Sequence, residues 1–171
     1  YTADSTWPYW HGIPTAPVTR DGKAYFDSES VNPLQDFGFR PAMSLAGRSK
    51  EEVFKLIDRG VLADASFPVG DAYLLQTGDT VRSVRYPEFE AFQAHWPSAT
   101  GITSQYWEFE KMKQNWISNK SNVFLYLTGF MGVPELTTNT FLPGAVADHL
   151  TSGGGVRIGG SQMSILDWLE A

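Results

Sequence analysis

The stretch NVFLYLTG, residues 122–129, decides the fold of this 171-residue chain. Within it, the run VFLYLT at residues 123–128 carries no charge and is almost wholly apolar. Such a run predicts a strand that is buried on both faces, as in the middle of a parallel sheet. We therefore expect residues 123–128 to form the central strand of the domain.

Helical and strand patterns alternate on both sides of this run. A helix is predicted over residues 49–60, where Ser49 caps the start, Glu52 completes a capping box and Gly60 ends the helix. The other predicted strands are residues 42–47, 71–79 and 144–150, and the other predicted helices are residues 87–96, 104–120 and 161–171. Alternation of this kind favours an α/β fold, with a mainly parallel sheet flanked by helices.

The helix over residues 104–120 is predicted from the spacing of its apolar side chains. Phe109, Met112 and Trp116 repeat at intervals of three and four residues, which places them on one face of a helix.

The last predicted helix, residues 161–171, has two possible caps at its start, Ser161 and Ser164. No glycine or asparagine follows its final turn to end it. We therefore expect the helix to lead into further chain, so that the α/β domain is incomplete at Ala171.

The first part of the sequence differs from the rest. Residues 1–40 are rich in proline and aromatic residues and show no helical period, so we expect an irregular arm, with a turn at Asp21–Gly22. Residues 41–171 are expected to form the α/β domain. The aromatic residues of the arm predict contact with a partner, because they have little local core to enter.

Composition excludes several classes of function. The net charge of −6 argues against a nucleic-acid surface and against binding to an anionic membrane. The absence of cysteine removes disulfides, thiolate metal ligands and a cysteine nucleophile. No apolar stretch approaches the roughly 20 residues that cross a bilayer.

Candidate functional residues follow the predicted strands. In parallel sheets, ligands and catalytic groups gather outside the carboxyl ends of the strands. The polar and small residues at these ends are Thr77, Gly78, Asp79, Thr128, Gly129, Asp148, His149, Thr151 and Ser152. Among them, His149, Ser152 and Asp148 are the candidate catalytic residues.

Known motifs do not cover these residues. No G-x-S-x-G elbow surrounds Thr151 or Ser152, and the glycines at 153–155 lack the lysine of a phosphate loop. Asp148 and His149 are successive residues of a strand, so their side chains should point to opposite faces and not reach one metal ion. We expect a structural or weakly functional His149, no metal and no cofactor.

Five segments carry a resemblance to a known family. They are RPAMSLAG (40–47), LIDRGVLAD (56–64), AYLLQTGDTVRSVR (72–85), PGAVADHLTSGGG (143–155) and QMSILDWLEA (162–171). Together they resemble an uncharacterised bacterial family associated with exosortase-type protein-sorting systems. The resemblance implies a secreted protein located outside the cytoplasm, in the periplasm or at the cell surface, and a chain that continues past Ala171.

A more distant similarity is to the caspase-like fold of gingipain-type cysteine peptidases. In those proteins one strand ends in His-Gly and the next ends in the nucleophilic cysteine. Here Thr128–Gly129 stands in the first place, and residues 144–155 hold no cysteine in the second. The similarity therefore implies a caspase-like topology without that catalytic pair.

These observations lead to two hypotheses. The first is a non-catalytic α/β domain of the cell envelope or surface that acts in binding or assembly, with a protein partner or a second copy of itself. The alternative is a peptidase-like hydrolase with a site around Asp148, His149, Thr151 and Ser152. Neither hypothesis involves nucleic acid or a membrane span.

Overall fold

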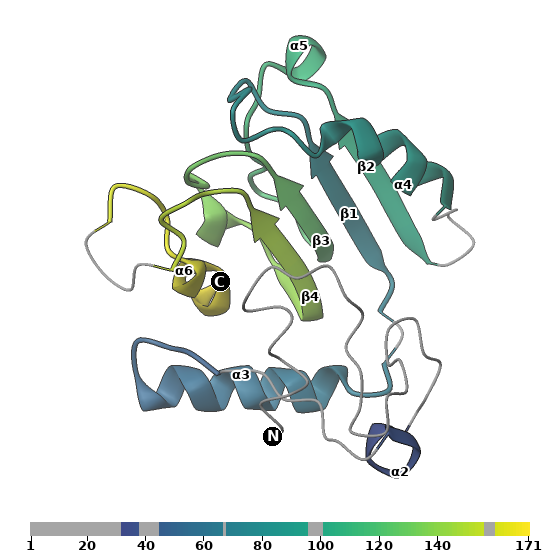
Figure 1. The fold of residues 1–171 in the computed structure, drawn as a ribbon, viewed down its shortest axis with the longest axis vertical. Helices are drawn as coiled ribbons and strands as arrows, with labels where there is room; N and C mark the ends of the chain where they lie inside the picture. Colours follow the sequence, from purple (N-terminus) through teal and green to yellow (C-terminus); the bar gives the residue numbers. More distant parts are fainter. Residues whose placement is uncertain (1–31, 38–44, 67, 96–100, 156–159) are drawn as a thin grey trace. The chain divides into compact units, whose positions relative to one another are not determined.

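The computed structural model describes residues 32–37, 45–66, 68–95, 101–155 and 160–171 (Figure 1). The chain divides into two units, Tyr1–Leu45 and Ala46–Ala171. In the first unit, the described element is the short helix α2, Pro33–Phe37, and the backbone N–H of Gln35 donates to the Asn32 side chain ahead of it. Apart from residues 32–37, the predicted arm lies outside the described residues.

A parallel sheet forms the second unit. Its strands are β1 (Gly70–Leu75), β2 (Ile102–Trp107), β3 (Val123–Thr128) and β4 (Phe141–His149), in the order β2-β1-β3-β4. All three neighbouring pairs are parallel (Figure 1). The α/β fold with a parallel sheet is confirmed, and so is the inner position of β3, which lies between β1 and β4.

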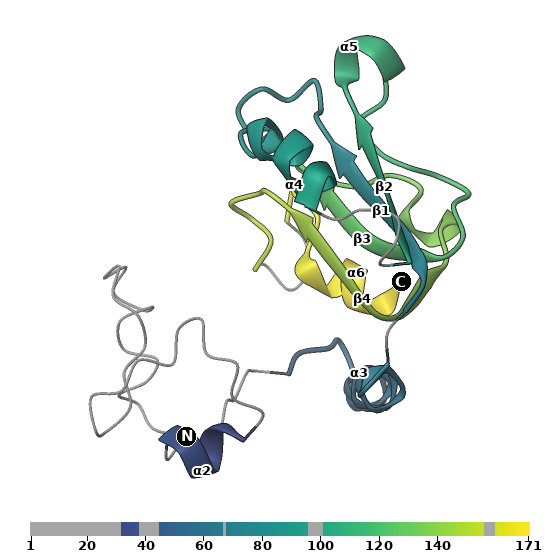
Figure 2. The same ribbon diagram turned by 90° about the vertical axis from the view of Figure 1, so that its right-hand side faces the viewer.

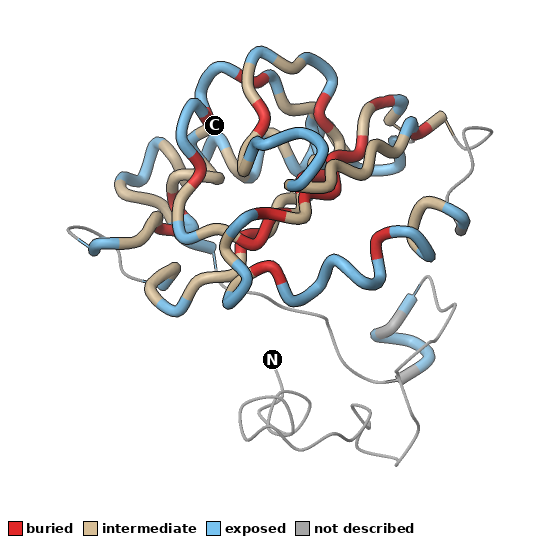
Figure 3. Tube along the Cα trace, turned by 90° about the horizontal axis from the view of Figure 1, so that it is seen from above, coloured by how far each residue is buried: buried red, intermediate tan, exposed pale blue. Residues whose placement is uncertain are grey.

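Each face of the sheet has its own apolar cluster, because alternate strand residues point to opposite sides. On one face, Tyr73, Leu75 and Tyr126 pack with Trp168 of helix α6 (Ile165–Glu170). On the other face, Ala72, Leu74 and Leu125 pack with Phe89, the first residue of helix α4 (Phe89–His95). Figure 2 shows α4 along one side of the sheet. Most residues of the inner strands β1 and β3 are buried, and Figure 3 marks the buried positions along the chain.

Helix α3, Lys50–Ala63, begins as predicted. The Ser49 side chain accepts a hydrogen bond from the backbone N–H of Glu52, while the Glu52 carboxylate accepts from the backbone N–H of Arg48. The predicted end at Gly60 is wrong. A glycine inside a helix costs only about 1 kcal/mol, and helical residues continue through Ala63.

The predicted helix over residues 104–120 is also wrong. Most of its first part belongs to β2, and only the single turn α5, Phe109–Met112, is helical. Pairing decides the outcome, since β2 lies in parallel register against β1 from Ile102 to Trp107. Aromatic and β-branched residues such as Ile102 and Tyr106 suit a strand, which outweighs the helical spacing farther along.

The remaining elements need smaller corrections. The predicted turns over residues 87–96 are confirmed as the 3-10 turn η1 (Tyr86–Glu88) followed by α4. Of the predicted strand 42–47, residues 42–44 lie outside the described residues, and residues 45–47 form no strand. Strand β4 starts three residues earlier than predicted, at Phe141.

Helix α6 is shorter than the predicted helix over residues 161–171. Of its two possible caps, Ser164 is the one used, and its hydroxyl accepts from the backbone N–H of Leu166. The Asp167 carboxylate accepts from the backbone N–H of Ser164, which completes a capping box. In the described ranges, no helix is long and apolar enough to span a membrane.

Candidate functional site

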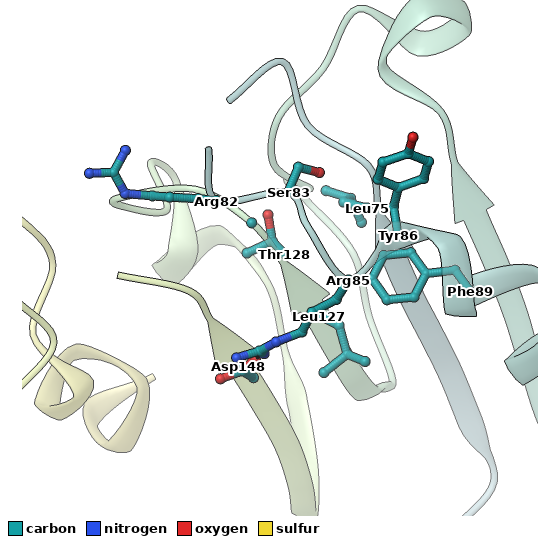
Figure 4. A pocket seen from close by; sticks show the side chains of 10 residues that line it. Leu75, Arg82, Ser83, Arg85, Tyr86, Phe89, Leu127, Thr128 and Asp148 are labelled. Carbon is teal, nitrogen blue, oxygen red and sulfur yellow. Dashed lines mark ion pairs between the residues drawn. The ribbon is translucent and has the colours of Figure 1, made fainter. Parts of the chain in front are cut away.

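The carboxyl ends of β1, β3 and β4 meet at one edge of the sheet, as the parallel topology requires. A small cavity lies there, between these ends and the loop that follows β1 (Figure 4). We call it the strand-end site, and it is lined by Leu75, Arg82, Ser83, Arg85, Tyr86, Phe89, Leu127, Thr128, Gly129 and Asp148. This is the position where parallel α/β sheets bind their ligands.

The loop after β1 is held tightly against the end of β3. The Thr77 hydroxyl donates to the Gly129 carbonyl at 2.6 Å, and the Ser83 hydroxyl accepts from the Thr77 backbone N–H at 2.9 Å. A Cβ atom at Gly129 would lie 2.4 Å from the Arg82 carbonyl oxygen and from the Ser83 Cα. Only glycine permits this close approach, so Gly129 allows the loop after β1 to pack against the end of β3.

Two ion pairs complete the strand-end site. Arg82 pairs with Asp79 at 2.7 Å within the loop, and Arg85 pairs with Asp148 at the end of β4 (Figure 4). The Arg85–Asp148 pair joins the loop to β4. The cavity beneath has a volume of about 10 Å³, which is room for about one water molecule.

His149 lies on the opposite face of the sheet from Asp148 and is buried, with 9% of its surface exposed. Its Nδ1 accepts a hydrogen bond from the Trp168 indole N–H at 2.7 Å. An indole nitrogen can only donate, so Nδ1 carries no proton, and Nε2–H donates to the Met163 carbonyl at 3.1 Å. Burial lowers the pKa of His149 below its ordinary value, which keeps the ring neutral.

Thr151 and Ser152 are engaged by Gln162 across the turn that follows β4. The Gln162 side-chain oxygen accepts from the Thr151 hydroxyl and from the Gly153 backbone N–H, the latter at 2.7 Å. The Ser152 hydroxyl lies 3.4 Å from both polar atoms of the same amide. Within the described residues, no hydrogen bond links either hydroxyl to His149.

The structure therefore separates the candidate catalytic residues into three places. Asp148 lies in the strand-end site, and His149 lies in the core beneath α6. Ser152 lies in the turn after β4 that the Gln162 side-chain amide bridges by hydrogen bonds. A nucleophile needs a base within hydrogen-bond reach, and both ring nitrogens of His149 already have partners. The chemistry available to this arrangement is hydrogen bonding and ion pairing, which stabilise the loops.

Several residues of these networks were missed from the sequence. Arg82 and Arg85 are two of them, although a place in the loop that follows a predicted strand is a signal for the carboxyl edge of a parallel sheet. Gln162 and Trp168 carry no such signal, because they reach the turn and His149 from the α6 segment. Pairings of this kind become visible only once the fold is known.

A metal centre finds little support in these side chains. Across the part of the chain that the structure describes, no three residues of the types His, Cys, Asp and Glu lie close enough to hold an ion. The chain is thus a parallel α/β domain with a small, internally paired site at its strand ends. Comparisons with protein-family models, curated proteins and solved structures found no match.

Proposed function

We propose that this chain is a non-catalytic α/β domain that acts by binding a protein partner. The observation that carries the proposal is the state of His149, whose two ring nitrogens are both engaged, by Trp168 and by Met163. A histidine in this state has no lone pair for a substrate or for the Ser152 hydroxyl. The alternative hydrolase would have to dismantle this network before any reaction.

Exposed apolar side chains support a binding role. On α3, Phe54, Val61 and Leu62 expose 51%, 69% and 70% of their surface. Single apolar residues on a surface are ordinary, but several on one helix indicate a contact surface. Exposed apolar side chains on α3 therefore accompany a small, internally paired strand-end site.

The proposed location, outside the cytoplasm in the envelope or at the cell surface, rests on the resemblance to the exosortase-associated family. The caspase-like topology is likewise proposed from resemblance. In its favour, β3, β4 and a helix follow one another in the order that the similarity implies, and β3 ends at Thr128 beside Gly129.

An activity assay tests the proposal against the hydrolase. The full chain is incubated with a library of quenched fluorescent peptides and with a fluorophosphonate probe that labels activated serines. The Ser152→Ala variant and the Ser121→Ala variant, which removes another exposed serine, are run in parallel. We expect no turnover and no labelling in any of them. Turnover that disappears in Ser152→Ala and persists in Ser121→Ala would overturn the proposal.

A further inference from the structure

Strand β4 is the outermost strand on its side of the described sheet, and a groove runs along it. The groove has a volume of about 370 Å³ and lies between α3, β4 and α6, all in the second unit. We call it the β4 groove. Its lining includes Leu56 and Arg59 of α3, Val146 and Ala147 of β4, and Ile165 and Leu169 of α6.

The lining of the β4 groove is apolar with a single charge. Val146 and Ile165 expose 55% and 53% of their surface, although both are large aliphatic side chains. Arg59 is the charged residue of the lining, and it donates one hydrogen bond to the Leu169 carbonyl. A guanidinium has five N–H donors, so Arg59 retains donors for a carboxylate.

The backbone of β4 offers the pairing pattern of a strand edge. Its regular part runs from Val146 to His149, in parallel register with Leu125 to Thr128 of β3. Within the described residues, no hydrogen bond from outside the sheet reaches the backbone of residues 145–148. Pro143 and Gly144, with φ of +80° at the glycine, interrupt the earlier part. Among the described residues, the outer backbone groups of the regular part therefore present the donors and acceptors of a strand edge.

We propose that the β4 groove binds an extended segment of a protein partner, which adds to β4 as a further strand. The segment carries apolar side chains at alternate positions and a carboxylate that pairs with Arg59. This inference rests on the proposed binding function and names the chemistry of the partner. Main-chain hydrogen bonds supply affinity in this mode, and side chains that alternate between the two sides supply specificity.

The walls of the β4 groove favour a single extended segment over a second copy of this chain. Helix α3 packs closely against β4, since a Cβ atom added at Gly144 would lie only 2.8 Å from the Cβ of Ala63. Helix α6 packs against one face of the same strand. A second β4 would bring its own α3 and α6 to the same place. A lone peptide strand has no such helices and fits between the walls.

Peptide binding tests the inference. The probes are capped, fluorescein-labelled heptapeptides of alternating valine and threonine in which one aspartate occupies each position in turn. Binding to the full chain is measured by fluorescence anisotropy, and backbone pairing is measured by hydrogen exchange. We expect saturable binding for at least one peptide, slower exchange at residues 145–148, and about tenfold weaker binding when that peptide is N-methylated at alternate residues.

Variants assign the binding to the groove. Ile165→Asp should weaken it about tenfold, whereas Val81→Asp, on a valine that is 78% exposed in the loop after β1, should change it less than about twofold. An aspartate at the start of α6 is compatible with the helix dipole, so folding is preserved. Replacing the peptide aspartate by asparagine should weaken binding to the native chain but not to Arg59→Gln.

The inference is overturned if no peptide of the set binds at millimolar concentration, or if the N-methylated peptide binds equally well. It is also overturned if exchange at residues 145–148 slows with protein concentration alone, since that result identifies a second copy as the occupant. Neither outcome affects the proposed non-catalytic function, which depends on the separate hydrolysis assay. Conversely, turnover that depends on Ser152 would leave the peptide result standing.

Discussion

The strand-end site and the β4 groove differ in almost every physical respect, although both border β4. At the strand-end site, polar groups pair with one another: Arg85 with Asp148, and Thr77 with Gly129. In the β4 groove, apolar side chains such as Val146 and Ile165 remain exposed. The polar region is satisfied from within and the apolar region is not. When a partner covers an exposed apolar region, the burial stabilises the complex by about 25 cal/mol for each Å² of apolar surface removed from water.

The largest effect is expected from Leu125→Ala, which should destabilise the sheet that carries both the strand-end site and the β4 groove. Leu125 is 6% exposed and belongs to the inner strand β3, so truncation leaves a cavity. We expect a loss of about 2–5 kcal/mol in the free energy of unfolding, measured by urea denaturation. A loss below about half a kilocalorie would place Leu125 outside the core, contrary to the sheet order described above.

Gly129→Ala should separate the two regions. The added Cβ must displace the backbone at Arg82 and Ser83, which we expect to cost about 1–3 kcal/mol by comparison with other overpacked sites. Peptide binding in the β4 groove should not change. Gly155→Ala is the matched control, because a Cβ there meets no atom within 4 Å. Equal losses in the two variants would contradict the tight packing of the loop on Gly129.

Trp168→Phe should leave the buried Nδ1 of His149 without its donor. Loss of a partner by a buried polar atom costs about 1–3 kcal/mol, measured again by urea denaturation. Trp116→Phe serves as a control, since the Trp116 ring is also half-buried and packs on Phe130. A loss for Trp168→Phe that does not exceed that of the control would show that the indole contributes packing alone.

Acid should destabilise the fold through His149. The pKa of His149 is lowered by burial, so the unfolded chain takes up a proton near pH 6.5 while the folded chain resists it. The stabilising contribution is therefore present above about pH 6.5 and is lost as the pH falls toward the folded-state pKa. Urea denaturation between pH 7.5 and 5.5 measures this fall. The decrease should be smaller in His149→Gln, and identical pH profiles would contradict the assignment.

The smallest effect is expected from Arg85→Gln. Both partners of the Arg85–Asp148 pair are exposed by 40% or more, and exposed ion pairs contribute about 0–1 kcal/mol. The free energy of unfolding should therefore change by less than about 1 kcal/mol. A change above about 2 kcal/mol would mean that this pair, and not the packing on Gly129, closes the strand-end site.

The parts of the fold that local sequence determines could be predicted. The uncharged run at residues 123–128 gave the inner strand, and Ser49 with Glu52 gave the start of α3. The segment that became β2 could not be predicted, because its strand conformation depends on pairing with β1, whose residues lie far away in the sequence. Apolar spacing at Phe109, Met112 and Trp116 is a local pattern and indicated a helix instead.

The candidate site divides in the same way. Alternation along a strand was enough to expect that Asp148 and His149 point to opposite faces. Their partners, Arg85 and Trp168, come from a loop before β2 and from the last helix. These contacts depend on the order of strands and on helix packing, which a single sequence does not specify.

The position of β1 between β2 and β3 has a consequence for how the chain folds. Both neighbours of β1 follow it in the sequence, so the ribosome releases β1 before either neighbour exists. When two parallel strands pair, the long connection between them must close into a loop, and this closure lowers the entropy of the chain before the strands make favourable contacts. Parallel sheets are therefore slow to form. The pairing of β1 therefore stays incomplete until Val123–Thr128 has been synthesised. During that interval we expect β1 to expose apolar surface, which is the kind of surface that chaperones bind.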